Sequence, residues 1–188
     1  FVLTCVGDNA KINVKKSRKD QSLINKAVDF ISSEKNDLKI IDYFPLGSDE
    51  RQYCSPGFNL PIATIMRSIP GTFKEYHTSL DNLNFIQTSK IEEVSKFCSQ
   101  IIRVIELNLK FKNKIMFCEP QLGKRGLYRR FGGQKFNSKD HEAIKWVLNL
   151  SDGNNDLIDI SKRSKIDIEI LYKVSVVLLN KDLIEYCN

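Results

Sequence analysis

The amino-terminal part of the chain places one amphipathic stretch between apolar runs, and this order restricts the folds that are open to it. Residues 1–7 read as a buried strand, residues 11–16 alternate apolar and polar side chains like a half-exposed edge strand, and residues 38–44 form a further apolar run. Residues 20–34 have helical spacing, with Asp20 as the expected N-cap. The helix gathers its apolar side chains on one face: Leu23, Ala27, Phe30 and Ile31. Strand, helix and strand in succession predict an α/β layer.

The next two predicted elements extend this layer. Residues 60–67 read as a third buried strand, which ends at the Pro70-Gly71 turn. Residues 89–109 form the longest predicted helix, and its apolar stripe should cover the sheet. That stripe consists of Ile91, Val94, Ser95, Cys98, Ile101, Ile102, Ile105 and Leu109. We therefore expect an α/β domain over residues 1–110.

The carboxyl-terminal part reads as a small domain over residues 137–188. Before it, residues 111–136 are rich in Gly and Arg and lack a helical period, and we interpret them as an extended basic connecting segment. A tight turn between two short helices, followed by a strand, predicts a winged helix or helix-turn-helix. The predicted elements are a helix capped by Asn137 or Ser138 and ending near Leu150, a break at 151–155, helices over 156–164 and 168–180, and a strand from Leu183.

Composition narrows the setting of the chain. No apolar stretch approaches the length of a membrane-spanning helix, and no signal peptide precedes the first strand. The sequence begins with Phe1 rather than an initiator Met, so we expect it to be part of a longer protein. The 5 cysteines are scattered, without a C-x-x-C pair, which argues against a disulfide framework and a cysteine-rich zinc cluster. A reduced cytoplasm is the simplest location for them.

The net charge of +6 is unevenly distributed. Residues 137–188 carry 7 Lys/Arg and 9 Asp/Glu, a net of −2, and residues 1–136 carry the excess of basic groups. Much of this excess lies between Lys110 and Lys135, with 8 basic side chains against Glu119 alone. Such a patch attracts phosphate, nucleic acid or an acidic substrate, but it is equally compatible with a solvated basic surface. The acidic balance of the tail domain itself argues against DNA contact.

Two polar clusters surround the short apolar run of residues 62–66 and give the best candidate site. The first cluster spans residues 47–61 and the second residues 75–83, so each is predicted to lie on a loop beside a strand end, where open α/β sheets place their chemistry. His77 lies in the second cluster, and neutral imidazole is a common zinc ligand that a carboxylate such as Asp81 can orient. On spacing alone, however, His77 is better explained as a turn residue and Asp81 as a helix cap, because one histidine does not make a metal site.

The remaining candidates also have ordinary structural explanations. Asp49, Glu50 and Arg51 could bind a metal, a substrate amine or a substrate carboxylate, but such triplets are common partners in loop salt bridges. Asp8 follows the first strand and could ligate a metal or start a turn. His141 is expected on the polar side of the first tail helix, as a surface residue.

Taken together, these segments resemble a known family, the bacterial "aminopeptidase-like domain" proteins, over nearly the whole chain. These proteins join a zinc-peptidase fold to a C-terminal winged helix and often occur among polysaccharide-biosynthesis genes. The resemblance rests on blocks that occur in the same order: Leu3-Thr4-Cys5-Val6-Gly7-Asp8, Gly47-Ser48-Asp49-Glu50-Arg51-Gln52-Tyr53-Cys54-Ser55-Pro56-Gly57, Glu75-Tyr76-His77-Thr78-Ser79-Leu80-Asp81, Glu119-Pro120-Gln121-Leu122-Gly123-Lys124-Arg125-Gly126-Leu127-Tyr128, and Trp146-Val147-Leu148-Asn149 with Ser151-Asp152-Gly153.

Through this family the chain is similar to the zinc aminopeptidase and glutamate carboxypeptidase superfamily. The resemblance implies an α/β sandwich of the zinc-peptidase type, represented by its C-terminal half, followed by a winged helix. It implies that His77 is a zinc ligand and that Asp8 is the candidate for a carboxylate ligand, with Thr4 as the alternative alignment. It places Asp49, Glu50, Arg51 and Tyr76 along the substrate pocket and Asp81 behind His77.

The superfamily takes its first histidine, an aspartate and the glutamate that serves as general base from earlier in the domain, and this chain does not supply them. The activity expected of the intact protein is a zinc-dependent aminopeptidase-like hydrolase of a peptide or related amide bond, with no hydrolysis by this chain alone. The alternative is a non-catalytic binding or scaffold protein that uses the winged helix for protein contacts and, less readily, for nucleic acid. We expect no membrane association, and the sequence leaves a homo-oligomer open.

Overall fold

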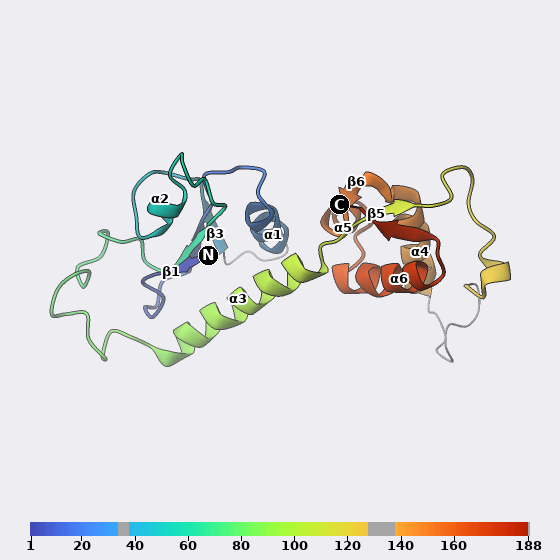
Figure 1. Cartoon of the computed structure of the whole chain (residues 1–188). Helices are drawn as coiled ribbons and strands as arrows, with labels where there is room; N and C mark the ends of the chain where they lie inside the picture. The colour runs from blue at the N-terminus through green and yellow to red at the C-terminus, as the bar shows by residue number, and fades with distance from the viewer. Residues whose placement is uncertain (34–37, 128–137, 188) are drawn as a thin grey trace. The chain divides into compact units, whose positions relative to one another are not determined.

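The chain folds into two compact units, residues Phe1–Ile105 and Glu106–Asn188, which are described separately. The structure is a computed structural model in which residues 1–33, 38–127 and 138–187 are described (Figure 1). Within these ranges, no helix has the length and apolar character needed to cross a membrane.

The first unit is built on a mixed sheet of 4 strands in the order β1-β4-β2-β3. β1 runs parallel to β4 and β2 runs parallel to β3, whereas β2 and β4 pair antiparallel. The strands are β1 (Val2–Leu3), β2 (Ile12–Lys15), β3 (Leu38–Ile41) and β4 (Thr64–Met66). The parallel pair β1 and β4 therefore ends at one edge of the sheet, and the expected mixed α/β architecture is confirmed.

β2 is an internal strand, so the prediction of an edge strand at residues 11–16 was wrong. It pairs with β4 on one side and β3 on the other, and Asn13, Val14 and Lys15 are all buried. The alternation of polar and apolar residues was misleading because Lys15 buries its ammonium inside the unit. A polar residue in a strand thus turned out to be a buried ion-pair partner.

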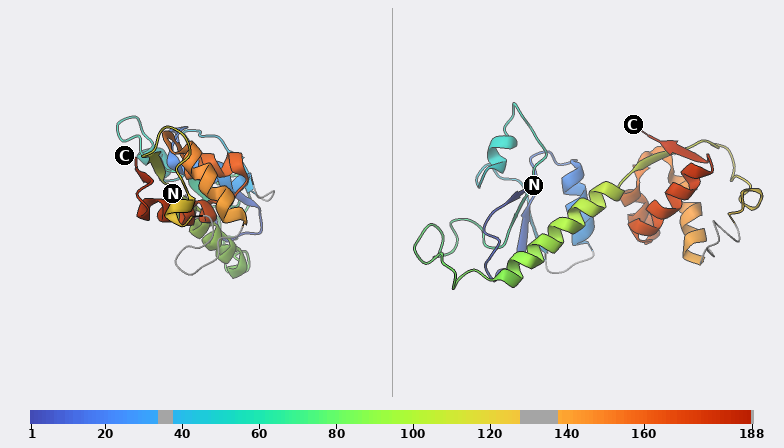
Figure 2. Two further views of the ribbon diagram at one scale, coloured as in Figure 1. Left: turned by 90° about the vertical axis from the view of Figure 1, so that its right-hand side faces the viewer. Right: turned by 60° about the horizontal axis from the view of Figure 1, so that its bottom comes forward.

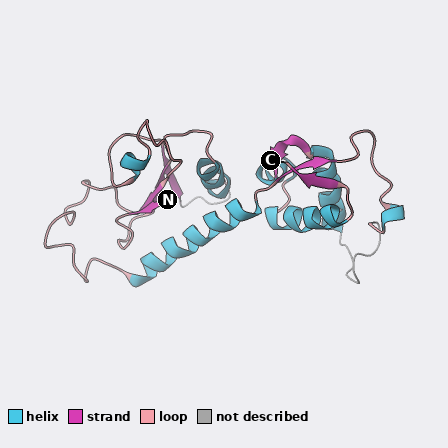
Figure 3. Ribbon diagram, in the orientation of Figure 1, coloured by secondary structure: helices cyan, strands magenta, loops and turns pink. Residues whose placement is uncertain are grey.

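Three helices accompany this sheet, and their colours in Figure 3 separate them from the long loops. α1 (Leu23–Ser32) begins two residues later than predicted, because Ser22 rather than Asp20 is the N-cap and its side chain accepts from the backbone N–H of Asn25. α2 (Glu50–Tyr53) is a single turn inside the first polar cluster. α3 (Thr88–Leu107) is the long helix.

The buried side of α3 differs in part from the predicted stripe. Two residues of that stripe, Ile91 and Ile102, are 42% and 51% exposed, so the buried face of α3 does not follow the predicted positions throughout. The side chains that α3 buries are Val94, Phe97, Cys98, Ile101, Val104 and Leu107. A loop with no helix or strand connects β4 to α3 and is seen extending from the sheet in Figure 2.

The second unit packs three helices with an antiparallel sheet of 3 strands in the order β6-β5-β7. Its core is apolar, with Ile144, Leu157, Leu171 and Leu178 fully buried. The elements are β5 (Lys110–Asn113), the 3-10 turn η1 (Gly123–Arg125), α4 (Ser138–Leu150), β6 (Asp152–Asp156), α5 (Leu157–Ser164), α6 (Ile168–Asn180) and β7 (Ile184–Tyr186). The predicted tail helices are present with closely similar bounds.

Two features of this unit differ from the sequence-based expectation. β5 starts at the predicted end of the α/β domain and continues into the predicted connecting segment, yet it forms the centre of the second unit's sheet. The predicted break after Leu150 is instead strand β6, which pairs with β5. Both pairings join residues about 40 positions apart or more, which local sequence patterns do not report. Positions 128–137 of the predicted connection and its boundary lie outside the described residues.

Candidate functional site

A pocket of about 590 Å³ opens in the first unit where the segments after β1 and β4 meet. The loop after β1 supplies Asp8, the turn before α2 supplies Gly47 and Ser48, and the loop before α3 supplies His77 and Asp81. Because β1 and β4 are parallel neighbours, their carboxyl ends bring the loops of Asp8 and His77 to the same edge of the sheet. The turn before α2 follows β3, which runs in the direction opposite to β4, and it reaches the pocket through the residues between β3 and α2. The two polar clusters singled out in the sequence therefore contribute to one pocket.

Asp8 is a buried carboxylate, 4% exposed, that ties two of these loops together. Its Oδ1 accepts from the backbone N–H of Ala10 at 2.7 Å, and its Oδ2 accepts from the backbone N–H of Ser68 at 3.1 Å. The first contact is the turn suggested by the sequence, and the second joins the loop after β1 to the residue that follows Arg67. Each oxygen keeps further acceptor capacity, so this structural role is compatible with ligation.

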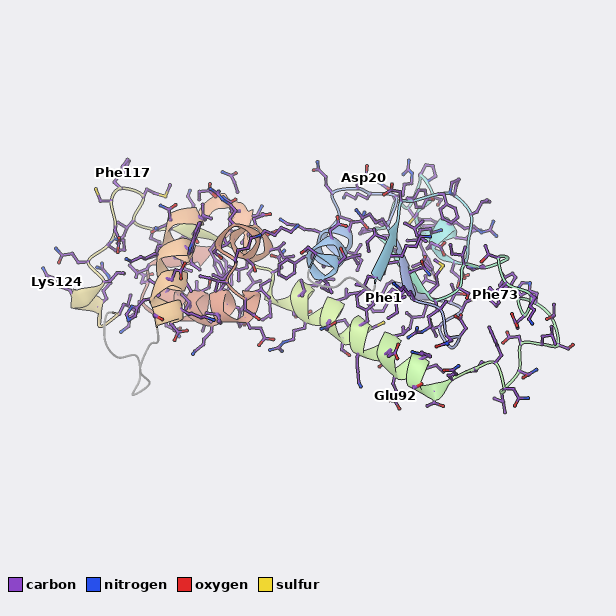
Figure 4. All side chains as sticks on the ribbon, turned by 180° about the vertical axis from the view of Figure 1, so that it is seen from behind. Phe1, Asp20, Phe73, Glu92, Phe117 and Lys124 are labelled. Carbon is purple, nitrogen blue, oxygen red and sulfur yellow. The ribbon has the colours of Figure 1, made fainter. Side chains whose placement is uncertain are left out.

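His77 is a turn residue with φ of +57°, and its exposed imidazole lines the pocket. The imidazole stacks on the ring of Tyr76, with centroids 4.0 Å apart and an interplanar angle of 14°. The Tyr76 ring in turn meets Phe73 edge-on at 5.5 Å, and Phe73 stacks with Phe85 at 5.8 Å. All four rings line the pocket, and Figure 4 marks Phe73 on its loop. One side of the pocket is therefore an aromatic wall.

Asp81 also lines the pocket but does not cap a helix. Its backbone N–H donates to the carbonyl of Thr78 at 3.1 Å in a turn, and the next helix, α3, starts only at Thr88. The capping explanation of this aspartate is therefore wrong. Asp81 shares the pocket with His77, as an orienting carboxylate would require, although no hydrogen bond between the two is present among the described contacts.

The charged triplet 49–51 directly follows the turn that lines the pocket, and its three residues are not among the lining residues. Asp49 precedes α2 without a side-chain capping bond, Glu50 is 1% exposed and paired with Lys15, and Arg51 is exposed. Gly47 and Ser48 are the residues of this segment that reach the pocket. Burial of a carboxylate in the middle of a surface triplet follows from the internal position of Lys15, which the sequence pattern did not reveal.

The described residues do not complete a zinc site by themselves. Zinc in proteins is held by about three or four protein ligands, and within the described ranges no group of three or more His, Cys, Asp or Glu side chains could hold a metal ion. Asp8, His77 and Asp81 line one pocket without forming such a group. The donor types suit zinc, but the described residues do not supply a complete ligand set.

The second unit has a pocket of its own, also about 590 Å³, beside α4 and the loop after β5. Trp146, expected in the apolar face of that helix, lines this pocket together with Met116, Glu119 and Lys145. Phe117 follows Met116 in the sequence, is labelled in Figure 4 and is 88% exposed. Two of the sequence blocks that carry the family resemblance contribute to this pocket, one through Glu119 and the other through Trp146, but the sequence alone did not indicate that the two blocks meet.

Matches to two protein families together cover nearly the whole chain. Residues 1–108 match the family described as "Domain of unknown function (DUF4910)", and residues 110–186 match the family described as winged helix-turn-helix. The junction between the two matches lies just before β5, which supports the assignment of this strand to the second unit. The predicted C-terminal winged helix is thereby confirmed.

A named sequence and a solved crystal structure, both from Clostridium acetobutylicum and both longer than this chain, are similar to it. One, named "Putative polysaccharide biosynthesis protein with aminopeptidase-like domain", is 41% identical over 187 residues, covering 95% of this chain and 43% of the relative. The other is a solved crystal structure of a "putative peptidase", with a TM-score of 0.79 and 36% identity, covering 98% of this chain and 41% of that one. The chain thus spans less than half the length of each.

Proposed function

The chain belongs to the family described as a domain of unknown function (DUF4910), here followed by a winged helix-turn-helix, and on this premise we propose that it forms one part of a zinc-dependent aminopeptidase-like hydrolase. The proposed fold of the complete catalytic domain is the α/β sandwich of zinc peptidases, of which residues 1–108 supply the C-terminal portion. The proposed reaction is cleavage of a peptide or related amide bond, in polysaccharide biosynthesis and in the cytoplasm.

The observation that carries this proposal is that Asp8, from the loop after β1, and His77 and Asp81, from the loop after β4, line one pocket. These two loops follow parallel strands, and the loop after β4 also supplies the aromatic wall, which suits a site that excludes water around an amide. The names of the two Clostridium relatives, an aminopeptidase-like domain and a peptidase, agree with this chemistry.

Each residue has a proposed role in the complete protein. His77 is the zinc ligand of this chain, with Asp8 as the candidate carboxylate ligand, and Asp81 orients the imidazole. Tyr76 and the turn at Ser48 contact the substrate. Asp49 and Arg51 place charged groups at the outer side of this turn, where they attract the charged ends of the substrate. The remaining ligands and the general base belong to the part of the complete protein that this chain does not include, so hydrolysis requires both parts.

An activity screen tests this proposal. The full-length protein is assayed on aminoacyl anilides and on acylated-sugar amides, before and after chelator treatment and zinc restoration, beside His77→Ala and His141→Ala variants. Chelator-sensitive hydrolysis that is lost in His77→Ala and kept in His141→Ala is expected. Hydrolysis that survives the loss of His77 unchanged would contradict the assigned role.

A second candidate function is a non-catalytic scaffold that contacts protein through its winged helix, and the charge of the α6 surface favours it. The exposed positions of α6 include Glu169 and Lys173, which leave that surface near neutrality rather than basic. Contact with protein, in cis or between copies, suits this surface better than contact with phosphate.

The salt dependence of DNA retention distinguishes contact with protein from contact with nucleic acid. The expected result is no retention of the full-length protein on duplex DNA at low salt. Retention that falls steeply with salt, and that disappears when Lys124, Arg125, Arg129 and Arg130 are neutralised, would instead assign nucleic-acid binding to the basic segment.

A further inference from the structure

The turn that brings Gly47 and Ser48 to the pocket packs against a buried ion pair between Lys15 of β2 and Glu50 of α2. The two side chains are 1% exposed each, and the Lys15 ammonium contacts Glu50 Oε1. The same ammonium donates to the carbonyl oxygens of Leu46 at 2.6 Å and Phe44 at 3.4 Å, and it lies 4.4 Å from the centroid of the Phe44 ring. Lys15 therefore holds both the segment that enters the turn and the helix that leaves it.

Gly47 lies directly over this pair. Its φ of +137° is a conformation that side-chain-bearing residues rarely adopt. A Cβ at this position would also collide with the Glu50 carboxylate and would lie 2.9 Å from Lys15 Nζ. The turn and the ion pair are thus packed so closely that neither can shift without the other.

Stability alone does not account for such a pair. Burying two charges costs about as much as their attraction returns, and well-packed apolar residues of similar volume are often equally stable or better. Glu50 Oε2 adds to this cost, because it is buried and finds no hydrogen-bond partner among the described residues. What the pair provides, and apolar side chains cannot, is directed bonding to two carbonyl oxygens and one helix.

We propose that Lys15 and Glu50 are positioning residues, which fix the Gly47–Ser48 edge of the pocket that also contains His77 and Asp8. Glu50 then acts through the turn and does not touch substrate. The relevance of this edge to catalysis rests on the proposed function, but the positioning itself is a property of the metal-free chain and is testable without any activity.

A set of paired variants tests the inference. Lys15→Met together with Glu50→Leu replaces the buried pair by apolar groups of similar size. The matched control is Lys16→Met with Asp29→Leu. It removes the neighbouring, half-exposed ion pair between Lys16, which follows β2, and Asp29 of α1, whose charged atoms are 2.8 Å apart and which does not line the pocket. Single changes, Lys15→Met and Glu50→Gln, serve as references, because each leaves one buried partner without the other.

Two measurements are made on each metal-free protein. Urea unfolding reports global stability, and amide hydrogen exchange reports α2, the single helical turn that follows Gly47–Ser48. Its three turn amides are those of Gln52, Tyr53 and Cys54, whose N–H groups donate to carbonyl oxygens of Asp49 and Glu50. The imidazole NMR signal of His77 reports the pocket, with His141 of the other unit as the internal reference.

The expected result is that the apolar pair keeps the unfolding midpoint of the parent, while the three turn amides exchange at least about tenfold faster and the His77 signal moves. The control pair should leave both readouts at the parental values. Unchanged exchange of the turn amides in the apolar-pair variant would overturn the inference. Failure of that variant to fold, or a uniform acceleration of exchange at all amides, would also overturn it, because either result would make the ion pair a determinant of global stability. A positive result in a full-length protein that holds no zinc would keep the positioning role and reject the hydrolase.

Discussion

The Asp8 carboxylate accepts a hydrogen bond from the backbone N–H of Ser68 at 3.1 Å, and this bond joins the loop after β1 to the segment after β4. Its other oxygen bonds to the N–H of Ala10 at 2.7 Å. The same side chain that is the candidate metal ligand therefore also holds the two loops at the sheet edge in place. Structural and chemical roles of Asp8 can be separated by experiment.

Asp8→Asn should destabilise the metal-free protein. The amide replaces one acceptor by an NH₂ group that faces a backbone N–H, so a buried donor loses its partner at a cost of about 1–3 kcal/mol. Urea unfolding measures this change, with the exposed Asp20→Asn as the control. Equal stability of the two variants would show that the carboxylate has no part in holding the loops.

Gly47→Ala should destabilise the first unit by about 1–3 kcal/mol, because the backbone conformation and the new Cβ are both unfavourable. Gly57→Ala is the matched control in a nearby segment, since a Cβ at that position would meet nothing within 4 Å. The unfolding midpoints of both variants test this. If the two substitutions had the same small effect, the turn would not be packed on the Lys15–Glu50 pair as described.

Asp152, the first residue of β6, accepts hydrogen bonds in a local turn, and this turn gives a prediction for pH. Backbone N–H groups of Asn154 and Asn155 bond to this carboxylate and lower its pKa from 3.8 to about 2. A group with a depressed pKa in the folded state stabilises the fold above its unfolded pKa and loses that contribution as pH falls toward the folded value. The second unit should therefore lose stability between about pH 4 and pH 2, in part through Asp152.

Carboxyl NMR titration should show Asp152 titrating near pH 2, and the Asp152→Asn variant should show a smaller loss of stability over that interval than the parent. Glu142→Gln, an exposed change on α4, is the control. Titration of Asp152 at its ordinary value would mean that the turn does not hold the carboxylate in solution.

Local signals were sufficient to predict the helices of the second unit. α6 begins after Asp167 and ends at Asn180 as its apolar period indicates, and the capping box between Asp156 and Asp159 fixes the start of α5. Helix α1 shifted because two acceptable caps, Asp20 and Ser22, lie close together, and Ser22 is the one whose oxygen reaches Asn25. Caps and periods are properties of neighbouring residues, so a sequence reports them well.

The order of the strands was not predictable in the same way. β4 inserts between β1 and β2, and β5 enters the centre of the second sheet, through pairings between residues far apart in the chain. For the site, the clusters around Ser48 and His77 do line one pocket, but strand ends explain only the second cluster, because Ser48 follows β3, which runs in the direction opposite to β4. The sequence pattern also did not reveal that Glu50 turns inward, because its partner Lys15 is on a strand whose alternation predicted exposure.

We propose that His77 contributes to a zinc site in the complete protein, and its zinc content is the direct test. The full-length protein and its His77→Ala and His141→Ala variants are dialysed exhaustively and analysed for metal, with circular dichroism to verify folding. We expect about one or two zinc ions per chain, retained in His141→Ala and clearly reduced in His77→Ala. Folded protein without zinc, or with zinc that is unaffected by the loss of His77, would contradict this proposal.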